Sequence, residues 1–484
     1  MSDLSIDGDA LIGSRAGRAR SWGTSVAGVL DVVIFYALPL LLVLVAIPYG
    51  SPEPWWQGVF QFIVFVLASL AIIERWLRAP NVAEAPAKVI SLWRGSGKLI
   101  LPLLAIIVLA LIQIFPWSGN VAGVNVQLTL SWDPLATKAF ILQLCALSLF
   151  GWLIFRYTVS ERRLWFLIDT IVGIAFVSAV FGLSRQAMQQ HVGFLLSALK
   201  PGFGYAQFIN SNHFAFLMEM TLGLTLGMAV TRGLSRRRLV VYLFAALVMW
   251  VAIVRVNSRG GILSMLSQVV LLGILVVANR EVVTTAKRPA GRIKRWVVSA
   301  SLILVLLVGS IITVIFVGGD PLAGRIDTLS VELNQQTAQT YTLRQNIWQA
   351  TWALIKDHPI AGVGFGGYWI AISQYHHASG ETTPQQAHND YLELIASGGV
   401  IGLALAVWFV VALGSVARRA VARSNKLERA VAVGALVGII TVAIHSIVDF
   451  GLHIPVNAAI CTALIALIVI AGKQNGKSAL ADRS

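Results

Sequence analysis

Residues 388–390 read His-Asn-Asp and stand directly before the apolar stretch YLELIASGGVIGLALAVWFVVALG at 391–414. A run of about 20 apolar residues is long enough to cross a bilayer as one helix. The polar entrance suits a helix N-terminus, because a side-chain oxygen of Asn389 or Asp390 can accept backbone N–H groups of the first turn. The stretch therefore predicts a membrane-spanning helix with His388 at its mouth.

The same apolar pattern recurs along the whole chain. Of its 484 residues, 57% are hydrophobic and only 12% are charged, which is more apolar surface than a soluble domain needs. We therefore predict an all-α polytopic membrane protein with about 12 transmembrane helices and one long periplasmic loop that contains short helices. The expected spans are 26–47, 55–74, 98–115, 134–156, 163–184, 210–231, 238–256, 260–278, 296–318, 391–414, 428–448 and 452–471.

The spans divide the chain into segments, and the longest polar one interrupts them near the C-terminus. We expect a cytoplasmic tail at 1–22, transmembrane helices 1–9 at 23–318, a periplasmic loop at 319–390, transmembrane helices 10–12 at 391–471 and a cytoplasmic tail at 472–484. In the loop, apolar residues at helical spacing from Tyr341 to Lys356 predict an amphipathic helix. The weak alternation in the outer loop 116–133 favours a hairpin or a strand-like cover.

The net charge of +15 is distributed unevenly. All but eight of the 37 Lys and Arg residues fall in the termini and loops of one side, which the positive-inside rule assigns to the cytoplasm. The basic excess therefore reflects membrane topology, both termini are expected in the cytoplasm, and no nucleic-acid partner is predicted. The outer cations are Lys138, Arg185, Lys200, Arg255, Arg259, Arg325, Arg344 and Lys356.

Arginine residues on the outer side suit a lipid diphosphate. A guanidinium group forms forked contacts with phosphate oxygens, and a charge at a membrane edge is costly unless it faces a cavity. Arg259 is the strongest candidate, because it stands against the charge bias in a loop of only a few residues at a span boundary. Pairing of these arginines with nearby acidic residues or with lipid headgroups is the alternative, and the sequence leaves it open.

His388 is the candidate general base. Because a helix N-terminus disfavours a positive imidazole, we expect His388 to be neutral near pH 7 and able to accept a proton from an attacking hydroxyl. A histidine that only forms hydrogen bonds at the membrane interface fits the spacing equally well.

His445, Asp449 and His453 recur every four residues. If this segment is helical, the three side chains share one face near the outer end of the eleventh span. We favour a structural hydrogen-bonded cluster, while a zinc site and contacts to the substrate are the alternatives.

Gly362, Gly364 and Gly367 match the pattern G-x-G-x-x-G. The surrounding sequence predicts no strand–turn–helix unit, so a dinucleotide site is not expected. We expect these glycines to allow a close approach to the membrane or to a glycan. The chain also has no Walker A sequence and no acidic pair in an inner loop suited to a nucleotide-sugar metal, so no nucleotide cofactor is predicted.

Several of these motifs together resemble the bacterial O-antigen ligase and O-antigen polymerase superfamily. The resemblance is carried by Arg344, HPIAGVGFG at 358–366, HNDYLELIASGGVIGL at 388–403, NSNHFA at 210–215, SRGG at 258–261 and the ending from His445 to Pro455. It is strong from about 205 to 460 and only topological before that. The first outer loop departs from the family because it lacks a Lys or Arg before Lys138.

The resemblance implies an inner-membrane glycosyltransferase with a periplasmic active site, no metal and no cofactor. The donor would be an undecaprenyl-diphosphate-linked glycan, and the acceptor a sugar hydroxyl on lipid A–core or on another lipid-linked repeat unit. By position, His388 matches the family's essential loop histidine and Arg259 a functional arginine. Arg185 and Arg344 are weaker matches, offered as diphosphate ligands. Substrate contacts or structural support are expected from Asn212, His213, Asn389, Asp449 and His453.

Two branches of the family fit the motifs. A ligase would join a finished chain to lipid A–core, whereas a polymerase would lengthen a lipid-linked glycan with a flippase and a chain-length regulator as partners; the ending from His445 leans mildly toward exopolysaccharide polymerisation. The alternative from another class is a polysaccharide-precursor transporter or flippase. Such a protein favours charges at the bilayer midplane and two repeated halves, whereas this sequence shows charges at the outer edge and no internal repeat.

Replacing Arg259 by lysine tests its predicted role. We expect Arg259→Lys to lose most glycan transfer, because a point charge does not reproduce the guanidinium fork. Transfer from a lipid-linked donor, measured in membranes with equal amounts of protein, gives the result. Arg236→Lys, a change on the opposite side of the membrane, is the control and should transfer normally. Full activity of Arg259→Lys would mean that Arg259 is not a diphosphate ligand.

Overall fold

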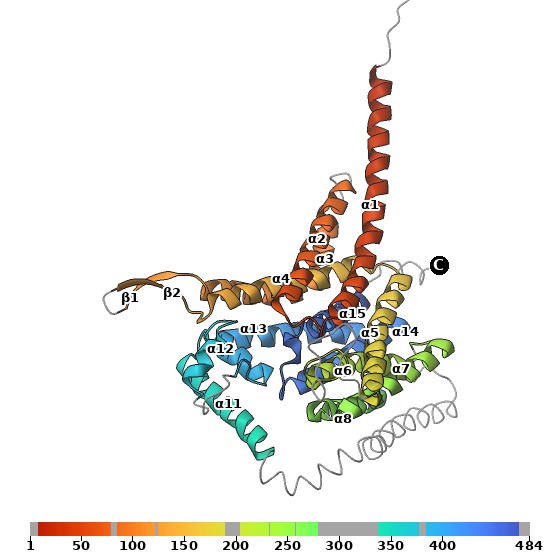
Figure 1. Cartoon of the computed structure of the whole chain (residues 1–484). Helices are drawn as coiled ribbons and strands as arrows, with labels where there is room; N and C mark the ends of the chain where they lie inside the picture. The colour runs from red at the N-terminus through yellow and green to blue at the C-terminus, as the bar shows by residue number, and fades with distance from the viewer. Residues whose placement is uncertain are drawn as a thin grey trace, which may run out of the picture.

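The computed structural model describes residues 8–78, 85–121, 124–188, 204–231, 233–256, 258–278, 337–376 and 384–473. Its helices are α1 (Gly8–Ala46), α2 (Pro54–Leu77), α3 (Ala85–Gln113), α4 (Pro134–Tyr157), α5 (Glu161–Ala187), α6 (Ser211–Val230), α7 (Arg236–Val256), α8 (Arg259–Ala278), α11 (Thr337–Asp357), α12 (Tyr368–Ala371), α13 (Asp390–Val421), α14 (Lys426–His445) and α15 (Pro455–Gly472) (Figure 1). Two short 3-10 helices, η1 (Ile372–Gln374) and η2 (Gly451–His453), and one antiparallel hairpin, β1 (Trp117–Val121) with β2 (Val124–Leu128), complete the described elements.

The helices confirm the predicted class of protein. Within the described residues, nine helices are long and apolar enough to cross a membrane, so the chain is a multi-pass membrane protein. The expected spans at 98–115 and 260–278 correspond to α3 and α8, in which the apolar stretches with described side chains are 97–113 and 260–274. The expected span at 296–318 lies outside the described residues. The count of twelve therefore stays a prediction.

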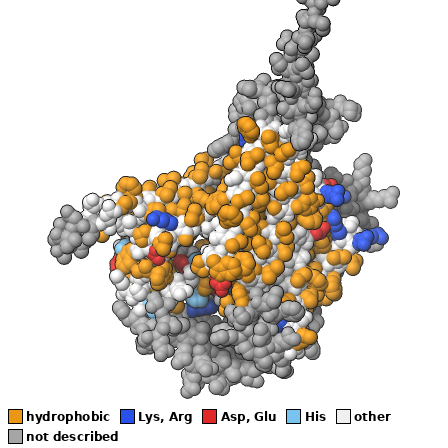
Figure 2. Space-filling view, turned by 45° about the horizontal axis from the view of Figure 1, so that its top comes forward, with side chains coloured by type: hydrophobic (Ala, Val, Ile, Leu, Met, Phe, Trp, Pro, Cys, Tyr) orange, Lys and Arg blue, Asp and Glu red, His pale blue; other side chains and the backbone are white. Residues whose placement is uncertain are grey.

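The surface of the bundle is mostly apolar. In the view of Figure 2, hydrophobic side chains cover most of the described surface. Large apolar residues such as Phe62 on α2 and Val410 on α13 are 69% and 65% exposed, which is unfavourable in water and favourable against lipid. This exposure is what a membrane-embedded bundle requires.

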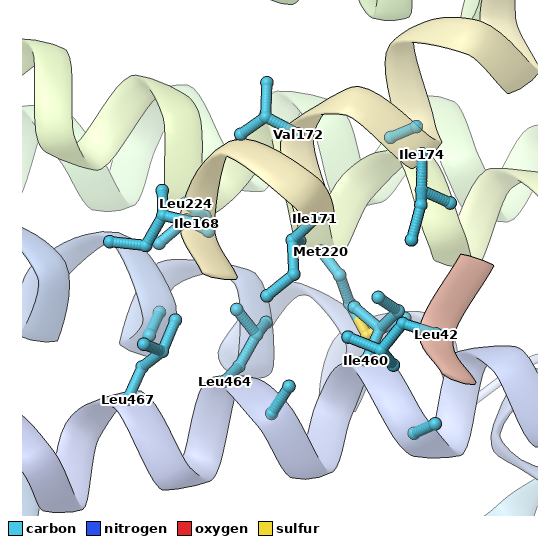
Figure 3. Close-up of a cluster of buried hydrophobic side chains, with 14 of the residues drawn as sticks. Leu42, Ile168, Ile171, Val172, Ile174, Met220, Leu224, Ile460, Leu464 and Leu467 are labelled. Carbon is cyan, nitrogen blue, oxygen red and sulfur yellow. The ribbon is translucent and has the colours of Figure 1, made fainter. Parts of the chain in front are cut away.

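Helix α6 forms the centre of the bundle and is buried on all sides. It packs against α14 through glycines spaced four residues apart on both helices: a Cβ at Gly223 would lie 2.5 Å from the nitrogen of Gly438, and one at Gly227 2.4 Å from the Cα of Gly434. Small residues at this spacing let two helix backbones approach closely inside a membrane. Side chains of α1, α5, α6 and α15 fill the neighbouring core (Figure 3).

Residues 337–376, which form α11, α12 and η1, make a lobe at one end of the bundle (Figure 1). Helix α11 spans the predicted amphipathic helix, and its apolar face, which includes Leu354, packs with Tyr368 and Ala396 in a separate small core. The hairpin lies within residues 116–133, where a hairpin or strand-like cover is predicted, and it projects from the bundle in Figure 1. At the N-terminus, α1 begins at Gly8, inside the segment predicted to be a cytoplasmic tail.

Helix α13 is broken at Gly399, where φ is 61° and ψ is −162°. The glycine-rich segment fits into the break: the N–H groups of Val363 and Gly364 donate to the carbonyl oxygens of Ala396 and Ser397 at 2.9 and 3.0 Å. These contacts satisfy backbone groups that the break leaves without helical partners. The glycines therefore approach protein backbone, and the prediction that they face the membrane or a glycan is wrong.

Gly399 offers a direct test of this break. We expect Gly399→Ala to destabilise the protein by about 1–3 kcal/mol or more, because its backbone angles are almost exclusive to glycine and a Cβ would lie 2.2 Å from the carbonyl oxygen of Ile360. Thermal unfolding in detergent measures the change. Gly414→Ala is the matched control on the same helix, since a Cβ there meets nothing within 4 Å. Equal midpoints for the two variants would contradict the argument.

Candidate functional site

Asp449 is the centre of the candidate site. It lies in the connection between α14 and α15, and its side chain is only 1% exposed. One carboxylate oxygen, Oδ1, accepts the N–H of Phe450 at 2.9 Å and lies 3.7 Å from Nδ1 of His388. The other, Oδ2, accepts the side-chain amide of Asn212 and lies 3.8 Å from a guanidinium nitrogen of Arg344. The carboxylate therefore joins side chains that come from α6, α11 and the entrance of α13.

The surroundings of Asp449 keep it ionised. Burial alone disfavours a carboxylate, but His388, the N–H of Phe450 and the neighbouring His213 outweigh burial and lower the pKa of Asp449 to about 2. A buried negative charge then faces Arg344 and His388 at neutral pH. An anion in this position can hold a guanidinium group and orient an imidazole at the same time.

His388 is held in an unusual backbone conformation. Its φ of 49° places it in the left-handed region, which histidine tolerates better than most residues and which often occurs at functional sites. Asn389 caps α13, because its Oδ1 accepts the N–H groups of Tyr391 and Leu392 at 3.0 Å. The N–H of Asp390 donates to the carbonyl oxygen of Ser446 at 2.9 Å, which ties this entrance to the end of α14.

The His388 side chain is partly accessible and is not locked in place. It is 33% exposed, and within the described residues its Nδ1 makes no hydrogen bond, because 3.7 Å to Asp449 is beyond hydrogen-bond range. Catalytic hydrogen bonds are often long before substrate binds. The geometry therefore leaves the imidazole room to move toward a substrate while Asp449 stays behind it.

Phe450 forms an apolar wall between three histidines. The rings of His213 and His388 each meet it edge to face with centroids 4.9 Å apart, and the ring of His453 does so at 5.9 Å. His213 is buried and lies 3.3 Å from the side-chain nitrogen of Asn210. His213 therefore supports the wall, whereas the side chains of His388 and His453 are 33% and 40% exposed.

His453 is the third histidine that packs against Phe450. Its Nε2 lies 3.4 Å from Asp390 and 3.7 Å from Glu393, and the second oxygen of Glu393 accepts the N–H of Ala387 at 2.8 Å. Packing against Phe450 partly desolvates His453 and opposes a charge on it, but the two carboxylates outweigh this desolvation and raise its pKa to about 9. A cationic His453 therefore fixes the segment that carries His388.

The three residues expected on one helical face separate in the structure. Helix α14 ends at His445, so Asp449 and His453 leave the helical pattern. His445 faces Glu219, Asp449 faces Asn212, and His453 faces Asp390. Within the described residues, no group of three or more His, Cys, Asp and Glu side chains is placed to hold a metal ion.

Glu219 is not among the residues that the sequence motifs single out. It lies in the middle of α6, fully buried, against His445. A single carboxylate inside an apolar span is rare, so this feature of the sequence could have identified Glu219 as a candidate functional residue.

The two remaining predicted arginines are Arg185 and Arg259. Arg185, near the end of α5, donates from Nη1 to the carbonyl oxygen of Ala206 at 3.0 Å, so it contacts the segment that leads into α6. Arg259 is the first residue of α8, and its side chain lies outside the described residues.

Part of the chain matches a known protein family. Residues 244–407 match the O-antigen ligase family. This match confirms the resemblance predicted from the sequence and supports a glycosyl-transferring membrane protein. It runs from α7 into α13 and includes Arg259, Arg344 and His388. Asn212 and Asp449 lie outside it, so the structure adds the central carboxylate to a site that the match covers in part. No curated protein matches the chain.

The charge on His453 predicts a pH dependence of stability. Its pKa is about 9 in the folded chain and about 6.5 in an unfolded one. The stabilisation is therefore fully present below about pH 6.5 and is lost as the pH rises through about 9. We expect the thermal midpoint of the wild type to fall more steeply from about pH 7 to 10 than that of His453→Gln. His376→Gln, a change just after η1, should follow the wild type; parallel curves for all three would contradict the assignment.

Proposed function

We propose that this protein transfers a glycan from undecaprenyl diphosphate to a saccharide acceptor on the periplasmic face of the bacterial inner membrane. One observation carries the proposal: a buried carboxylate, Asp449, has Arg344 beside one oxygen and His388 beside the other. A cation suited to a diphosphate and an imidazole suited to a hydroxyl are thereby held at one place. The match to the O-antigen ligase family supports this chemistry.

The transfer exchanges one C–O bond for another. The acceptor hydroxyl oxygen attacks the anomeric carbon of the donor sugar, while the bond from that carbon to the diphosphate oxygen breaks. The electron pair leaves with undecaprenyl diphosphate, and the hydroxyl proton passes to His388. The energy comes from the donor bond, so neither ATP nor a nucleotide sugar is needed.

His388 is the proposed general base. Nδ1 faces Asp449, so the tautomer with the proton on Nδ1 leaves the Nε2 lone pair for the substrate. Asp449 stabilises the imidazolium that forms when Nε2 takes the hydroxyl proton, as a buried aspartate does for other catalytic histidines. The carboxylate itself stays ionised because its pKa is about 2.

Arg344 is the proposed diphosphate ligand nearest to His388. It is 34% exposed on its side chain, so part of the guanidinium group can meet an incoming phosphate. Charge grows on the departing oxygens during the transfer, and a preorganised cation stabilises it without reorganisation. Arg259 and Arg185 are proposed as further ligands, Arg259 from the start of α8 and Arg185 from the end of α5.

The proposed periplasmic location follows from charge and connectivity. The site lies where the starts of α6, α13 and α15 meet the end of α14. The opposite ends of these helices adjoin the basic loops and tail that the positive-inside rule places in the cytoplasm.

The acceptor separates the two branches of the proposed function. A ligase uses lipid A–core, and its loss leaves long glycans on the lipid carrier. A polymerase uses another lipid-linked repeat unit, and its loss leaves single-repeat products on the surface. Deleting the gene and resolving both the surface glycan and the lipid-linked pool on a gel distinguishes these outcomes. Neighbouring genes for a flippase and a chain-length regulator would favour the polymerase.

His388→Ala tests the mechanism. We expect glycan transfer by the purified protein to fall by about 10²–10⁴-fold, the usual contribution of a general base, while membrane insertion is unchanged. His376→Ala is the control, since it removes a histidine just after η1 that lies outside the Asp449 group. The wild type should transfer equally well with a chelator present. Near-normal transfer by His388→Ala removes histidine from the mechanism, and translocation without transfer by the wild type would favour a transporter.

A further inference from the structure

A second carboxylate–imidazole pair lies deeper in the bundle than the Asp449 group. Nδ1 of His445 is 2.9 Å from Oε1 of Glu219, and the two side chains are 1% and 0% exposed. The pair joins the middle of α6 to the last residue of α14. Removing both groups from water is costly, and a well-packed apolar pair of similar volume would serve stability as well or better.

The imidazole of His445 is held on three sides. It stacks on Phe216 with centroids 4.2 Å apart and planes at 26°, and Glu219 holds its Nδ1. The remaining side meets α8, where a Cβ at Gly260 would lie 2.3 Å from Nε2. The ring therefore fixes the distance between α6, the end of α14 and the first turn of α8.

One neighbour of His445 leads to Arg259, a proposed diphosphate ligand, and the other leads to the candidate site. Gly260 follows Arg259 in the first turn of α8. In the other direction, the N–H of Val448 donates to the carbonyl oxygen of His445 at 2.9 Å, which closes the turn before Asp449. The next carbonyl oxygen, that of Ser446, accepts the N–H of Asp390 and so reaches the helix entrance that carries His388.

Helix association alone does not account for the pair. The contact between α6 and α14 is already made by Gly223 with Gly438 and by Gly227 with Gly434, which lie farther than the pair from the candidate site along both helices. The polar pair lies instead at the end of the interface nearest the site.

We propose that Glu219 and His445 act together as positioning residues for the transfer reaction, setting the start of α8, with Arg259, at a fixed distance from the turn that carries Asp449. Neither residue touches the substrate. This inference rests on the proposed function. Its consequence is that the pair controls the rate of the chemical step more than the binding of donor or acceptor.

Replacing the pair by apolar residues separates positioning from stability. We expect the double variant Glu219→Leu/His445→Phe to keep a thermal midpoint at or above that of the wild type. Its kcat should nevertheless fall by about 10–100-fold with both KM values within about twofold, because a small misplacement of catalytic groups lowers the rate of the chemical step. Glu219→Gln, which still accepts a hydrogen bond from His445, should keep kcat within about threefold.

Two controls complete the experiment. Thr225→Val changes a buried polar residue of α6 whose hydroxyl donates to the carbonyl oxygen of Thr221 in the same helix, and it should leave kcat unchanged. A double variant with wild-type kcat overturns the inference. If the double variant does not fold, the single variant His445→Gln decides, because its side-chain amide can still donate a hydrogen bond to the buried Glu219 carboxylate while the ring against Phe216 and Gly260 is lost. Wild-type kcat in that variant also overturns the inference, and a reduced kcat with unchanged KM values and an unchanged thermal midpoint supports it.

The outcome is distinguishable from failure of the proposed function. If the wild type transfers no glycan, or if His388→Ala transfers normally, the proposed function fails. If the wild type transfers and depends on His388 while the pair variants match it, only the positioning role fails.

Discussion

The close contact of α6 with α14 is the constraint on which the site depends. Glycines on both helices let the backbones touch, and any added Cβ would enter the space of the facing backbone. This contact fixes the relative height of the two helices. It therefore decides that the start of α6, with Asn212, meets the turn after α14, with Asp449, and that Glu219 meets His445. The contacts of Asn212 with Asp449 and of Glu219 with His445 both lie near one end of this apolar interface, and both follow from the same packing of α6 against α14.

The buried charge of Asp449 explains why the site residues come together. A carboxylate without water is costly unless cations and N–H donors surround it. Asn212 and the N–H of Phe450 supply hydrogen bonds, and Arg344 supplies a positive charge. The electrostatic requirement of one side chain thus gathers groups from three separate parts of the chain. On the proposed function, the same requirement places a diphosphate ligand next to the base.

The break in α13 gives His388 its position. The helix from Asp390 to Gly398 is a short half-helix, and the segment from Pro359 to Gly364 fills the gap at Gly399 with backbone hydrogen bonds. Gln113 of α3 adds to this brace, because its side chain donates to the carbonyl oxygens of Ala361 and Ser397. The half-helix is consequently held from two sides, which supports the backbone of the histidine directly before it.

The sequence by itself determined what is local. Apolar runs predicted the spans, helical spacing predicted α11, and a polar residue before an apolar run predicted a cap at Asn389 or Asp390, because each of these depends on neighbours within a few residues. The structure has the cap at Asn389. It also singled out His388, Arg344 and Asp449, through motifs that resemble a known family. Only the tertiary structure decided how these residues meet. Asn212 and Asp449 are 237 residues apart, and the four-residue spacing of His445, Asp449 and His453 suggested one shared face that the end of α14 at His445 removes. Periodicity describes one continuous element, whereas the site is built where elements end and their buried charges require partners from other helices.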